Sequence, residues 1–155
     1  MKKIPLTILL LLLWPFAAHA WTGKVVGISD GDTITVLLSQ DSLVKIRLYG
    51  IDAPEKGQPY SQAAKEYLAS LIAGKTVEIE PVTKDRYGRT VGIVFDNEKI
   101  INQEMVRAGF TWVYRKYCDK YFCSEWLRLE DKARSSRIGL WQELNPIPPW
   151  EWRRR

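Results

Sequence analysis

The sequence predicts an α+β protein that is mainly β: a five-stranded Greek-key barrel of the OB type with about three helices. Three observations lead to this fold. Five segments have the apolar alternation or turn-bounded β-rich composition of strands, a helical pattern follows the third segment, and further helical patterns gather near the end of the chain. Periodicity alone supports only an α+β protein with about five strands, and the order of elements is what favours the barrel.

Turn signals separate the predicted strands. Asp30-Gly31 is typical of a tight hairpin between the first two strands. In the third strand Val44, Ile46 and Leu48 alternate with polar residues, so Arg47 should point away from the apolar face. The five predicted strands cover residues 24–28, 33–38, 44–48, 76–82 and 90–95.

Three helices are predicted from apolar stripes and end signals. The first covers residues 59–73, with a proline near its start and Gly74 just past its end. Asn102 is expected to cap a short helix over residues 103–108, which stops at Gly109. Ser124 is expected to cap a last helix that runs to about residue 137.

Residues 1–20 have the pattern of a secretory signal peptide. Lys2 and Lys3 precede a 15-residue apolar run, and Ala18-His19-Ala20 is a small-x-small cleavage site. The run is shorter than the roughly 20 residues of a membrane span. We therefore expect an exported protein, periplasmic or secreted, cut after Ala20 and without stable membrane association. An uncleaved anchor that tethers the chain is the alternative.

The expected mature chain loses its only histidine, His19, together with two lysines. It keeps 21 Lys and Arg against 18 Asp and Glu, a net charge of +3 that permits a polyanionic partner. Without histidine, Ser-His-Asp and Cys-His catalysis and histidine metal ligands are excluded. No signal for an oligomer is visible, so a monomer is expected.

We expect the globular domain to cover residues 21–145, followed by a basic, tryptophan-containing tail over residues 146–155. The tail is rich in proline and ends with Trp150, Trp152 and three arginines, Arg153 to Arg155. Such an end is expected to be loose. It is either a solvated terminus or an additional phosphate contact.

Cys118 and Cys123 are the only cysteines of the chain. Two cysteines without histidine make a poor zinc site. An exported chain meets an oxidising compartment, which favours a disulfide that closes a short loop, with free thiols as the alternative.

Acidic and basic residues fall at the ends of the predicted elements. Asp32 and Asp52 each lie at a strand end, and Glu55 follows a bend stiffened by Pro54. Carboxylate oxygens suit a hard divalent cation, and the planar forks of Arg47 and Arg89 match phosphate oxygens. Each motif alone is more often an ordinary turn or loop.

The order and spacing of these motifs resemble the staphylococcal nuclease (thermonuclease) family over about residues 24–141. The chain departs from the founding member in a shorter segment after Glu55 and in its cysteine pair. The matching stretches are Asp30-Gly31-Asp32-Thr33, Arg47-Leu48, Asp52-Ala53-Pro54-Glu55, Asp85-Arg86-Tyr87-Gly88-Arg89 and Gly139-Leu140-Trp141.

This resemblance implies a metal and catalytic set. Asp32, Asp52 and the backbone carbonyl of Ala53 would bind one calcium ion, and Glu55 would orient or deprotonate the attacking water. Arg47 and Arg89 would hold the phosphate and stabilise its pentacoordinate state.

The resemblance also implies a substrate surface. Asp30 would contact the metal ligands without binding the ion itself. Tyr87 would lie beside the nucleotide, and either Trp112 or Tyr114 would stack on a base. The expected reaction is hydrolysis of DNA and RNA at the 5′ P–O bond, which leaves 3′-phosphate ends. The competing hypothesis is an OB-fold module that binds nucleic acid without cutting it.

Overall fold

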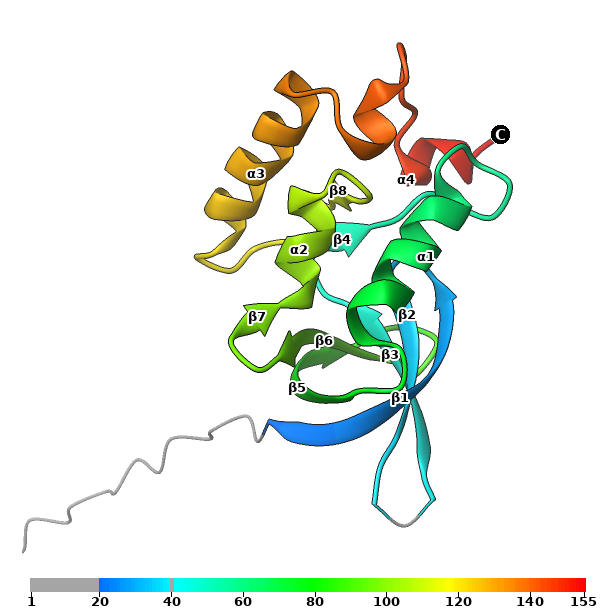
Figure 1. The fold of residues 1–155 in the computed structure, drawn as a ribbon, viewed down its shortest axis with the longest axis vertical. Helices are drawn as coiled ribbons and strands as arrows, with labels where there is room; N and C mark the ends of the chain where they lie inside the picture. Colours follow the sequence, from blue (N-terminus) through cyan, green and yellow to red (C-terminus); the bar gives the residue numbers. More distant parts are fainter. Residues whose placement is uncertain (1–19, 40) are drawn as a thin grey trace, which may run out of the picture.

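The computed structural model describes residues 20–39 and 41–155, so almost all of the expected signal peptide lies outside the described residues. Five strands, in the order β3-β2-β1-β5-β6, form a sheet that closes into a barrel because β3 and β6 pair in parallel. This confirms the predicted fold (Figure 1). The barrel strands are β1 (Trp21–Asp30), β2 (Thr33–Leu37), β3 (Leu43–Leu48), β5 (Thr76–Lys84) and β6 (Thr90–Asp96).

Three short strands lie outside the five predicted barrel strands. β7 (Lys99–Ile100) extends the sheet beside β6. β4 (Ile51–Asp52) pairs with β8 (Trp112–Val113) outside the barrel, opposing Asp52 to Trp112. The β4–β8 pair fixes the backbone on which one of the predicted acidic residues lies.

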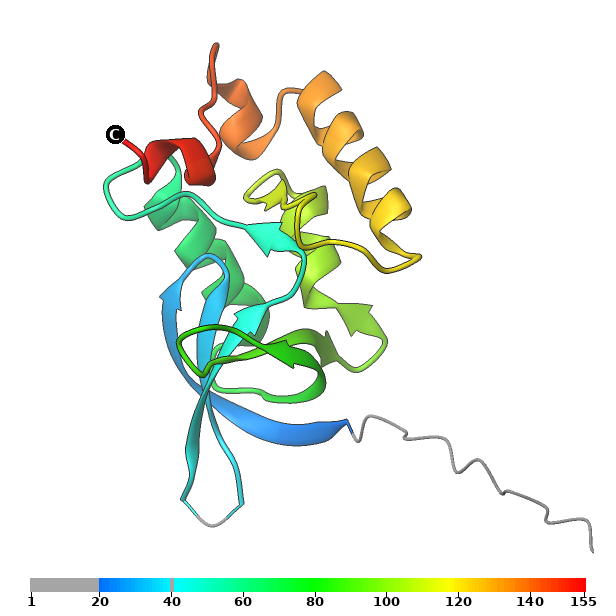
Figure 2. The same cartoon turned by 180° about the vertical axis from the view of Figure 1, so that it is seen from behind.

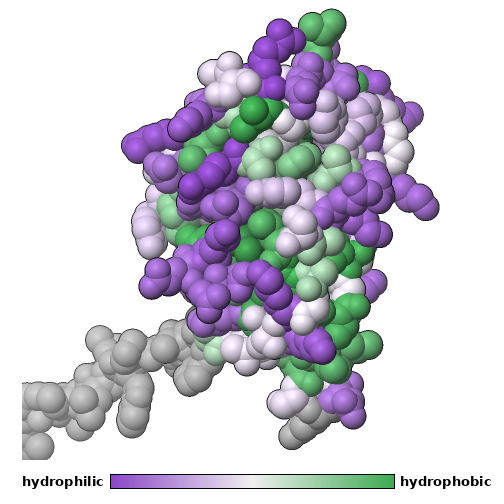
Figure 3. All heavy atoms as spheres, viewed as in Figure 1, coloured by the Kyte–Doolittle hydropathy of each residue, from purple (hydrophilic) through white to green (hydrophobic). Residues whose placement is uncertain are grey.

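Alternate side chains of the strands fill the barrel. Ile34 and Val36 of β2 and Ile46 and Leu48 of β3 are all buried, as the alternation predicts. Arg47 lies between two of them in sequence and points to the other side of the sheet. Hydrophobic surface remains near the β2–β3 hairpin, where Leu43 is exposed (Figure 3).

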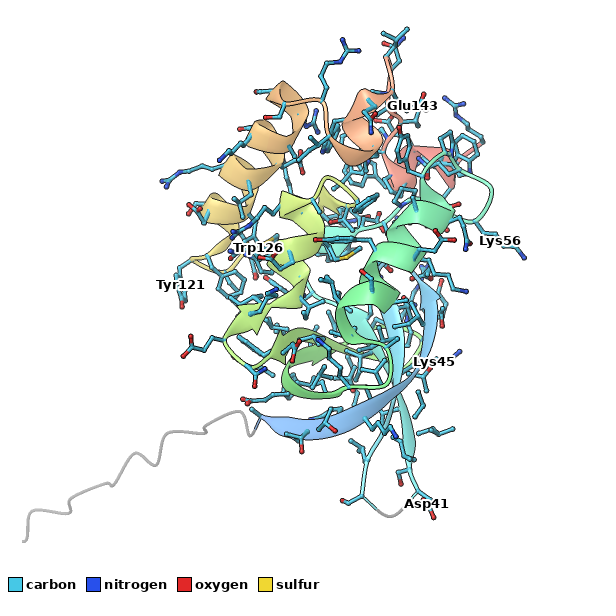
Figure 4. All side chains as sticks on the ribbon, viewed as in Figure 1. Asp41, Lys45, Lys56, Tyr121, Trp126 and Glu143 are labelled. Atoms are coloured by element: carbon cyan, nitrogen blue, oxygen red, sulfur yellow. A yellow bond between two sulfur atoms is a disulfide. The ribbon has the colours of Figure 1, made fainter. Side chains whose placement is uncertain are left out.

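Three helices lie along one side of the barrel and beyond its end (Figures 1 and 2). They are α1 (Ser61–Ile72), α2 (Ile101–Arg107) and α3 (Cys123–Ser135). Trp126 of α3 is completely buried, and Figure 4 shows where it lies between α2 and α3. No helix among residues 20–39 and 41–155 combines the length and apolarity that a membrane crossing requires.

Both predicted helix caps were wrong. Asn102 lies inside α2, where it accepts a hydrogen bond from the Val94 amide (2.9 Å) and donates to the carbonyl oxygens of Tyr49 (3.0 Å) and Gly92 (3.2 Å). A buried amide does more here by joining three segments than it would as a cap. Ser124 lies inside α3, and its hydroxyl donates to the Tyr121 carbonyl.

The expected loose tail is ordered in the structure. After the 3₁₀ helix η1 (Gly139–Gln142), the chain forms a one-turn helix, α4 (Pro149–Trp152), with proline in its first turn. Trp150 packs against a second hydrophobic cluster, which contains Trp112, Ala133, Leu140 and Trp141. A proline-rich chain end is thus held because its aromatic side chains find a hydrophobic surface.

The disulfide is present. Cys118 and Cys123 are bonded, with their Cα atoms 5.7 Å apart, and they close the loop before α3. This loop holds the turn after β3, because the Tyr49 hydroxyl donates to Asp119 at 2.6 Å and accepts from the Asp119 amide at 2.9 Å.

Candidate active site

The barrel brings Asp32, Arg47 and Asp52 together. In the register of β2 and β3, Thr33 faces Arg47, so Asp32, in the turn just before β2, meets the end of β3. The Asp32 carbonyl accepts a hydrogen bond from the Leu48 amide at 2.8 Å. One Arg47 guanidinium then contacts both acids, with Nη1 3.0 Å from Asp32 Oδ2 and Nη2 2.8 Å from Asp52 Oδ1.

This cluster is buried and held by backbone contacts. Asp32 is 5% exposed and Asp52 1% exposed. Asp32 Oδ2 accepts from the Ala53 amide at 2.5 Å, and Arg47 Nη1 donates to the Ile51 carbonyl at 2.9 Å. The acids and the guanidinium are therefore positioned before any substrate arrives, as a preorganised site requires.

Gly31 allows the β1–β2 turn to reach the site. A Cβ atom at Gly31 would lie 2.7 Å from the Ala64 Cβ of α1 and 2.8 Å from the Ala53 Cβ. The turn carrying Asp32 packs against both, and any larger residue would push it away. The Asp-Gly signal therefore reports close packing as well as a turn.

Burial raises the pKa of the Asp32 carboxyl to about 8. Arg47 and the Ala53 amide lower it, whereas the neighbouring charges of Asp30 and Asp52 raise it further. The effect of burial is larger than that of Arg47, so the net shift is upward. Additional positive charge beside Asp32 would favour its ionised form.

Asp30 and Glu55 border the cluster. Asp30 Oδ1 accepts from the Asp32 amide at 3.1 Å, so Asp30 shapes the turn that presents Asp32. The short segment after Glu55 is closed by Gln58, whose Oε1 accepts from the Glu55 amide at 2.9 Å. Gln58 also donates to the Ile147 carbonyl at 2.6 Å, which ties this segment to the C-terminal chain.

Arg153, just after α4, also lies in the acidic cluster. Its Nη2 is 2.8 Å from Asp52 Oδ2, its Nη1 is 3.3 Å from Asp52 Oδ1, and Nη1 also donates to Glu55. Burial disfavours the charged guanidinium, but its bonds with Asp52 and Glu55 outweigh this and raise the pKa of Arg153 above its usual value. Sequence reasoning missed this residue. The double proline followed by Trp150-x-Trp152-Arg153 was the only signal for a docked helix.

Arg89 lies on the turn between β5 and β6 and contacts Asp85 there. Asp85 Oδ2 accepts from Arg89 Nε at 2.6 Å, and Asp85 Oδ1 accepts from the Arg89 amide at 3.0 Å. Among the described residues, no ion pair or hydrogen bond joins Arg89 to Asp32, Arg47 or Asp52. Asp85 thus fixes Arg89 on a turn that precedes Val91 by two residues, and Val91 faces Arg47 across the β3–β6 pair.

The predicted substrate aromatics lie in different environments. Tyr87 is 68% exposed, with the guanidinium of Arg89 5.5 Å from its ring centroid. Trp112 is buried between Trp141 and Arg134, whose guanidinium lies 4.5 Å from the Trp112 ring. Tyr114 is half-buried, and its ring stacks on Trp150 with centroids 5.0 Å apart. Tyr87 is therefore accessible, and Trp112 occupies a core position.

The acids fit a hard divalent cation that takes part of its shell from elsewhere. Within the described part of the chain, no three His, Cys, Asp or Glu residues gather closely enough to hold a metal ion by themselves. Asp32 and Asp52 flank one guanidinium, and their carboxylate oxygens suit calcium or magnesium. Water and a phosphate oxygen would complete such a shell.

The comparisons with known proteins agree with this geometry. Residues 45–143, more than half of the chain, match the model of a family described as staphylococcal nuclease homologues. The matched segment contains Arg47, Asp52, Glu55 and Arg89, and Asp32 precedes it.

Three relatives are similar over most of their length. The chain is 43% identical to an uncharacterised endonuclease of Escherichia coli O157:H7, over 99% of this chain and 98% of that protein. It is 41% identical to an uncharacterised endonuclease of Haemophilus influenzae, over 99% and 86%. It is 40% identical to a micrococcal nuclease of Shigella flexneri, over 87% and 83%. The barrel, the acid–arginine cluster and these matches together show that the chain belongs to the staphylococcal nuclease family.

Proposed function

We propose that this protein is an exported, calcium-dependent nuclease that hydrolyses DNA and RNA at the 5′ P–O bond. Its family makes it a nuclease and a phosphodiesterase, with nucleic acid as substrate. The observation that supports the finer proposal is the Arg47 guanidinium, which bridges two buried carboxylates at 3.0 and 2.8 Å. This arrangement combines metal ligands with a phosphate-binding cation in one rigid unit.

Asp32, Asp52 and the Ala53 carbonyl would hold the calcium ion. When bound, the ion supplies positive charge that polarises a phosphate oxygen. The chain's own contribution is to keep Asp32 and Asp52 fixed, since both are buried and hydrogen-bonded. The Ala53 carbonyl ligand rests on the family resemblance and stays a prediction.

The reaction then needs a base and two cations. Glu55 takes a proton from water as the water oxygen bonds to phosphorus. The bond from phosphorus to the 5′ oxygen breaks and that oxygen takes a proton from a second water molecule, which leaves a 3′-phosphate and a 5′-hydroxyl. Arg47 and Arg89 stabilise the charge that builds on the equatorial oxygens. Tyr87 is exposed beside Arg89, where it can contact the sugar and phosphate of the substrate.

Digestion of plasmid DNA and of an RNA oligonucleotide tests this proposal. The purified protein of residues 21–155 should cut both with calcium and stop when a chelator removes it. Analysis of the ends should find 3′-phosphates and 5′-hydroxyls. Products with 5′-phosphates, or full cleavage in chelator, would refute the stated chemistry.

A double variant tests the assigned residues. Glu55→Gln/Arg89→Ala should lower the cleavage rate by more than about 10³-fold, since each residue has a separate role. The matched control is Glu98→Gln/Arg128→Ala, which changes the same residue types at exposed positions. Unchanged cleavage by a folded Glu55→Gln/Arg89→Ala protein would refute the assignment. A gel shift without product from the unaltered protein would instead identify a binding module.

Export is tested at the N-terminus. We infer that residues 1–20 are removed, because the charged start, the apolar run and the Ala-His-Ala site occur together. N-terminal sequencing of protein from the periplasm or medium should begin at Trp21. A chain that starts at Met1 in the membrane fraction would support a tethered enzyme.

A further inference from the structure

The C-terminal segment covers the candidate site. Figures 1 and 2 show α4 beside the loop that joins β4 to α1, and Lys56 marks the outer side of that loop in Figure 4. At this place Arg153 contacts both carboxylate oxygens of Asp52 and one oxygen of Glu55. The proposed function assigns these two acids to the metal and to the attacking water.

Contacts other than the ion pairs also hold this segment. Trp150 stacks on Tyr114 with an angle of 7° between the rings, and its edge packs on Trp112 at a centroid distance of 5.7 Å. Pro149 is buried, and the Ile147 carbonyl accepts from Gln58 at 2.6 Å. The hydrogen bond to Ile147 holds the chain before the buried proline, and the stacking of Trp150 holds it after the proline. These contacts dock α4, and the docked helix positions Arg153 against the acids.

Arg153 and a metal ion need the same oxygens. Both Asp52 oxygens accept from Arg153, and one also accepts from Arg47 at 2.8 Å. A divalent ion bound to Asp52 would lie beside the Arg153 guanidinium, where the two positive charges repel each other. Binding of the ion and docking of Arg153 therefore oppose each other, and this coupling must be reciprocal.

Trp150 and a nucleotide base would stack on the same aromatic ring, that of Tyr114. Tyr114 is one of the two aromatic residues expected to stack on substrate, and Trp150 covers one face of it. The other candidate, Trp112, is buried. Docking of α4 thus occupies a second element of the proposed site by a contact chemically separate from the ion pairs.

We propose that residues 147–155 form an internal latch that competes with calcium for Asp52 and Glu55 and with the nucleic acid for Tyr114. The proposal rests on the proposed function. In the open state the segment is undocked, so calcium and substrate can bind. Trp150, Trp152 and the three arginines are then exposed next to the bound phosphates. The closed state holds the acids with Arg153. The apparent calcium affinity is lowered by the fraction of molecules that are closed.

Calcium titration calorimetry tests the latch without relying on activity. Arg153→Ala should bind calcium about 5- to 100-fold more tightly than the unaltered protein, which is the range of common coupling between sites. The matched control is Arg154→Ala, which removes the same charge one residue away, at an exposed side chain that makes no ion pair or hydrogen bond with any other described residue. The control should change calcium affinity less than about twofold, since an exposed charge is screened.

Hydrogen exchange followed by mass spectrometry tests the motion of the segment itself. In the unaltered protein, saturating calcium should speed amide exchange in the peptide that contains residues 150–155 by about tenfold, because the docked helix opens. Trp150→Ala should give fast exchange without calcium. Exchange in the barrel strands provides the internal reference.

The outcomes separate the latch from the proposed function. If Arg153→Ala and Arg154→Ala bind calcium equally, or calcium slows exchange in the C-terminal peptide, the latch is wrong while calcium-dependent cleavage can still hold. If neither the unaltered protein nor Arg153→Ala binds calcium, both proposals fail. If Arg153→Ala loses cleavage at saturating calcium with unchanged calcium affinity, Arg153 is a phosphate-binding cation and the latch is overturned.

Discussion

Two arginines outside the barrel core, Arg89 and Arg153, are held in contrasting ways. Arg89 lies on the β5–β6 turn, and its side-chain ion pair is to Asp85, four residues away in sequence. Arg153 lies just after the C-terminal helix α4 and pairs with Asp52 and Glu55, about a hundred residues away. Among the described residues, Arg89, which was expected in the site, thus makes no ion pair with its acids, whereas Arg153, expected only in the basic tail, contacts two of them.

Because of this difference, Arg89 remains available to bind a substrate phosphate, whereas Arg153 occupies the acids of the site. Asp85 contacts Arg89 from within the same turn, and the bonds with the Arg89 side chain and amide lower the pKa of Asp85 although burial opposes this. That contact fixes the direction of Arg89 and consumes no proposed metal ligand. Arg153 instead occupies one proposed metal ligand, Asp52, and also Glu55, so removal of the two arginines should have opposite effects.

The largest expected effect comes from removing each arginine in turn. Arg89→Ala should lower kcat/KM by about 10²–10³-fold at saturating calcium, which is typical for loss of one transition-state donor. Arg153→Ala should leave the rate at saturating calcium within about twofold and raise it at limiting calcium. Initial rates on a fluorescent oligonucleotide, measured across calcium concentrations, distinguish the two.

Arg128→Ala on the exposed face of α3 is the matched control for lost charge. It should follow the unaltered protein at every calcium concentration. Loss of activity in Arg153→Ala equal to that in Arg89→Ala would end the contrast between the two residues.

A second prediction concerns the disulfide-closed loop, residues 118–123, which follows Tyr114 in the chain. Trp150 of the latch stacks on Tyr114. Cys118→Ser/Cys123→Ser should lower the free energy of unfolding by about 2 kcal/mol, the value expected for closing a loop of this length. Urea unfolding monitored by circular dichroism measures it. The Tyr49–Asp119 bonds remain, so cleavage under native conditions should change little. A reduced unaltered protein that unfolds at the same urea concentration as the oxidised form would contradict the prediction.

The strands of the barrel were predictable because their signals are local. Alternation in β2 and β3, the Asp-Gly turn and the spacing of Asp32, Arg47, Asp52 and Glu55 each lie within a short stretch. Even the outward direction of Arg47 follows from the two-residue period of a strand.

The remaining features depend on contacts between distant residues. Asn102 has the residue type of a cap, but its three bonds reach Val94, Gly92 and Tyr49, and no local pattern encodes them. Arg153 has the composition of a solvated end, and only the docking of Trp150 on Tyr114 carries it to Asp52. Trp112 and Tyr114 alternate on one extended segment, and the structure places the first in the core.

A third prediction tests the brace on Arg89. Asp85→Asn removes the charge that holds the Arg89 side chain but keeps an acceptor for the backbone amides of the turn. It should lower kcat/KM by roughly threefold to tenfold, a modest effect because the pair is partly exposed. In the Arg89→Ala background the same change should have no further effect. An equal loss in both backgrounds would show that Asp85 acts on the turn and not through Arg89.

The last prediction is a pH dependence at Asp32, one of the two acids that Arg47 contacts. With the Asp32 pKa raised to about 8 when folded and about 3.9 when unfolded, the native state holds a proton that the unfolded state has lost between these values. Stability in chelator should therefore fall as pH rises from about 4 to 8, by up to roughly 1.4 kcal/mol per pH unit.

Asp32→Asn stays neutral and should remove that slope. Urea unfolding of both proteins at pH 5, 6, 7 and 8 measures the difference, in which the other titrating groups largely cancel. The variant should gain stability relative to the unaltered protein as pH rises. A constant difference across this range would mean that Arg47 keeps Asp32 ionised although it also serves Asp52.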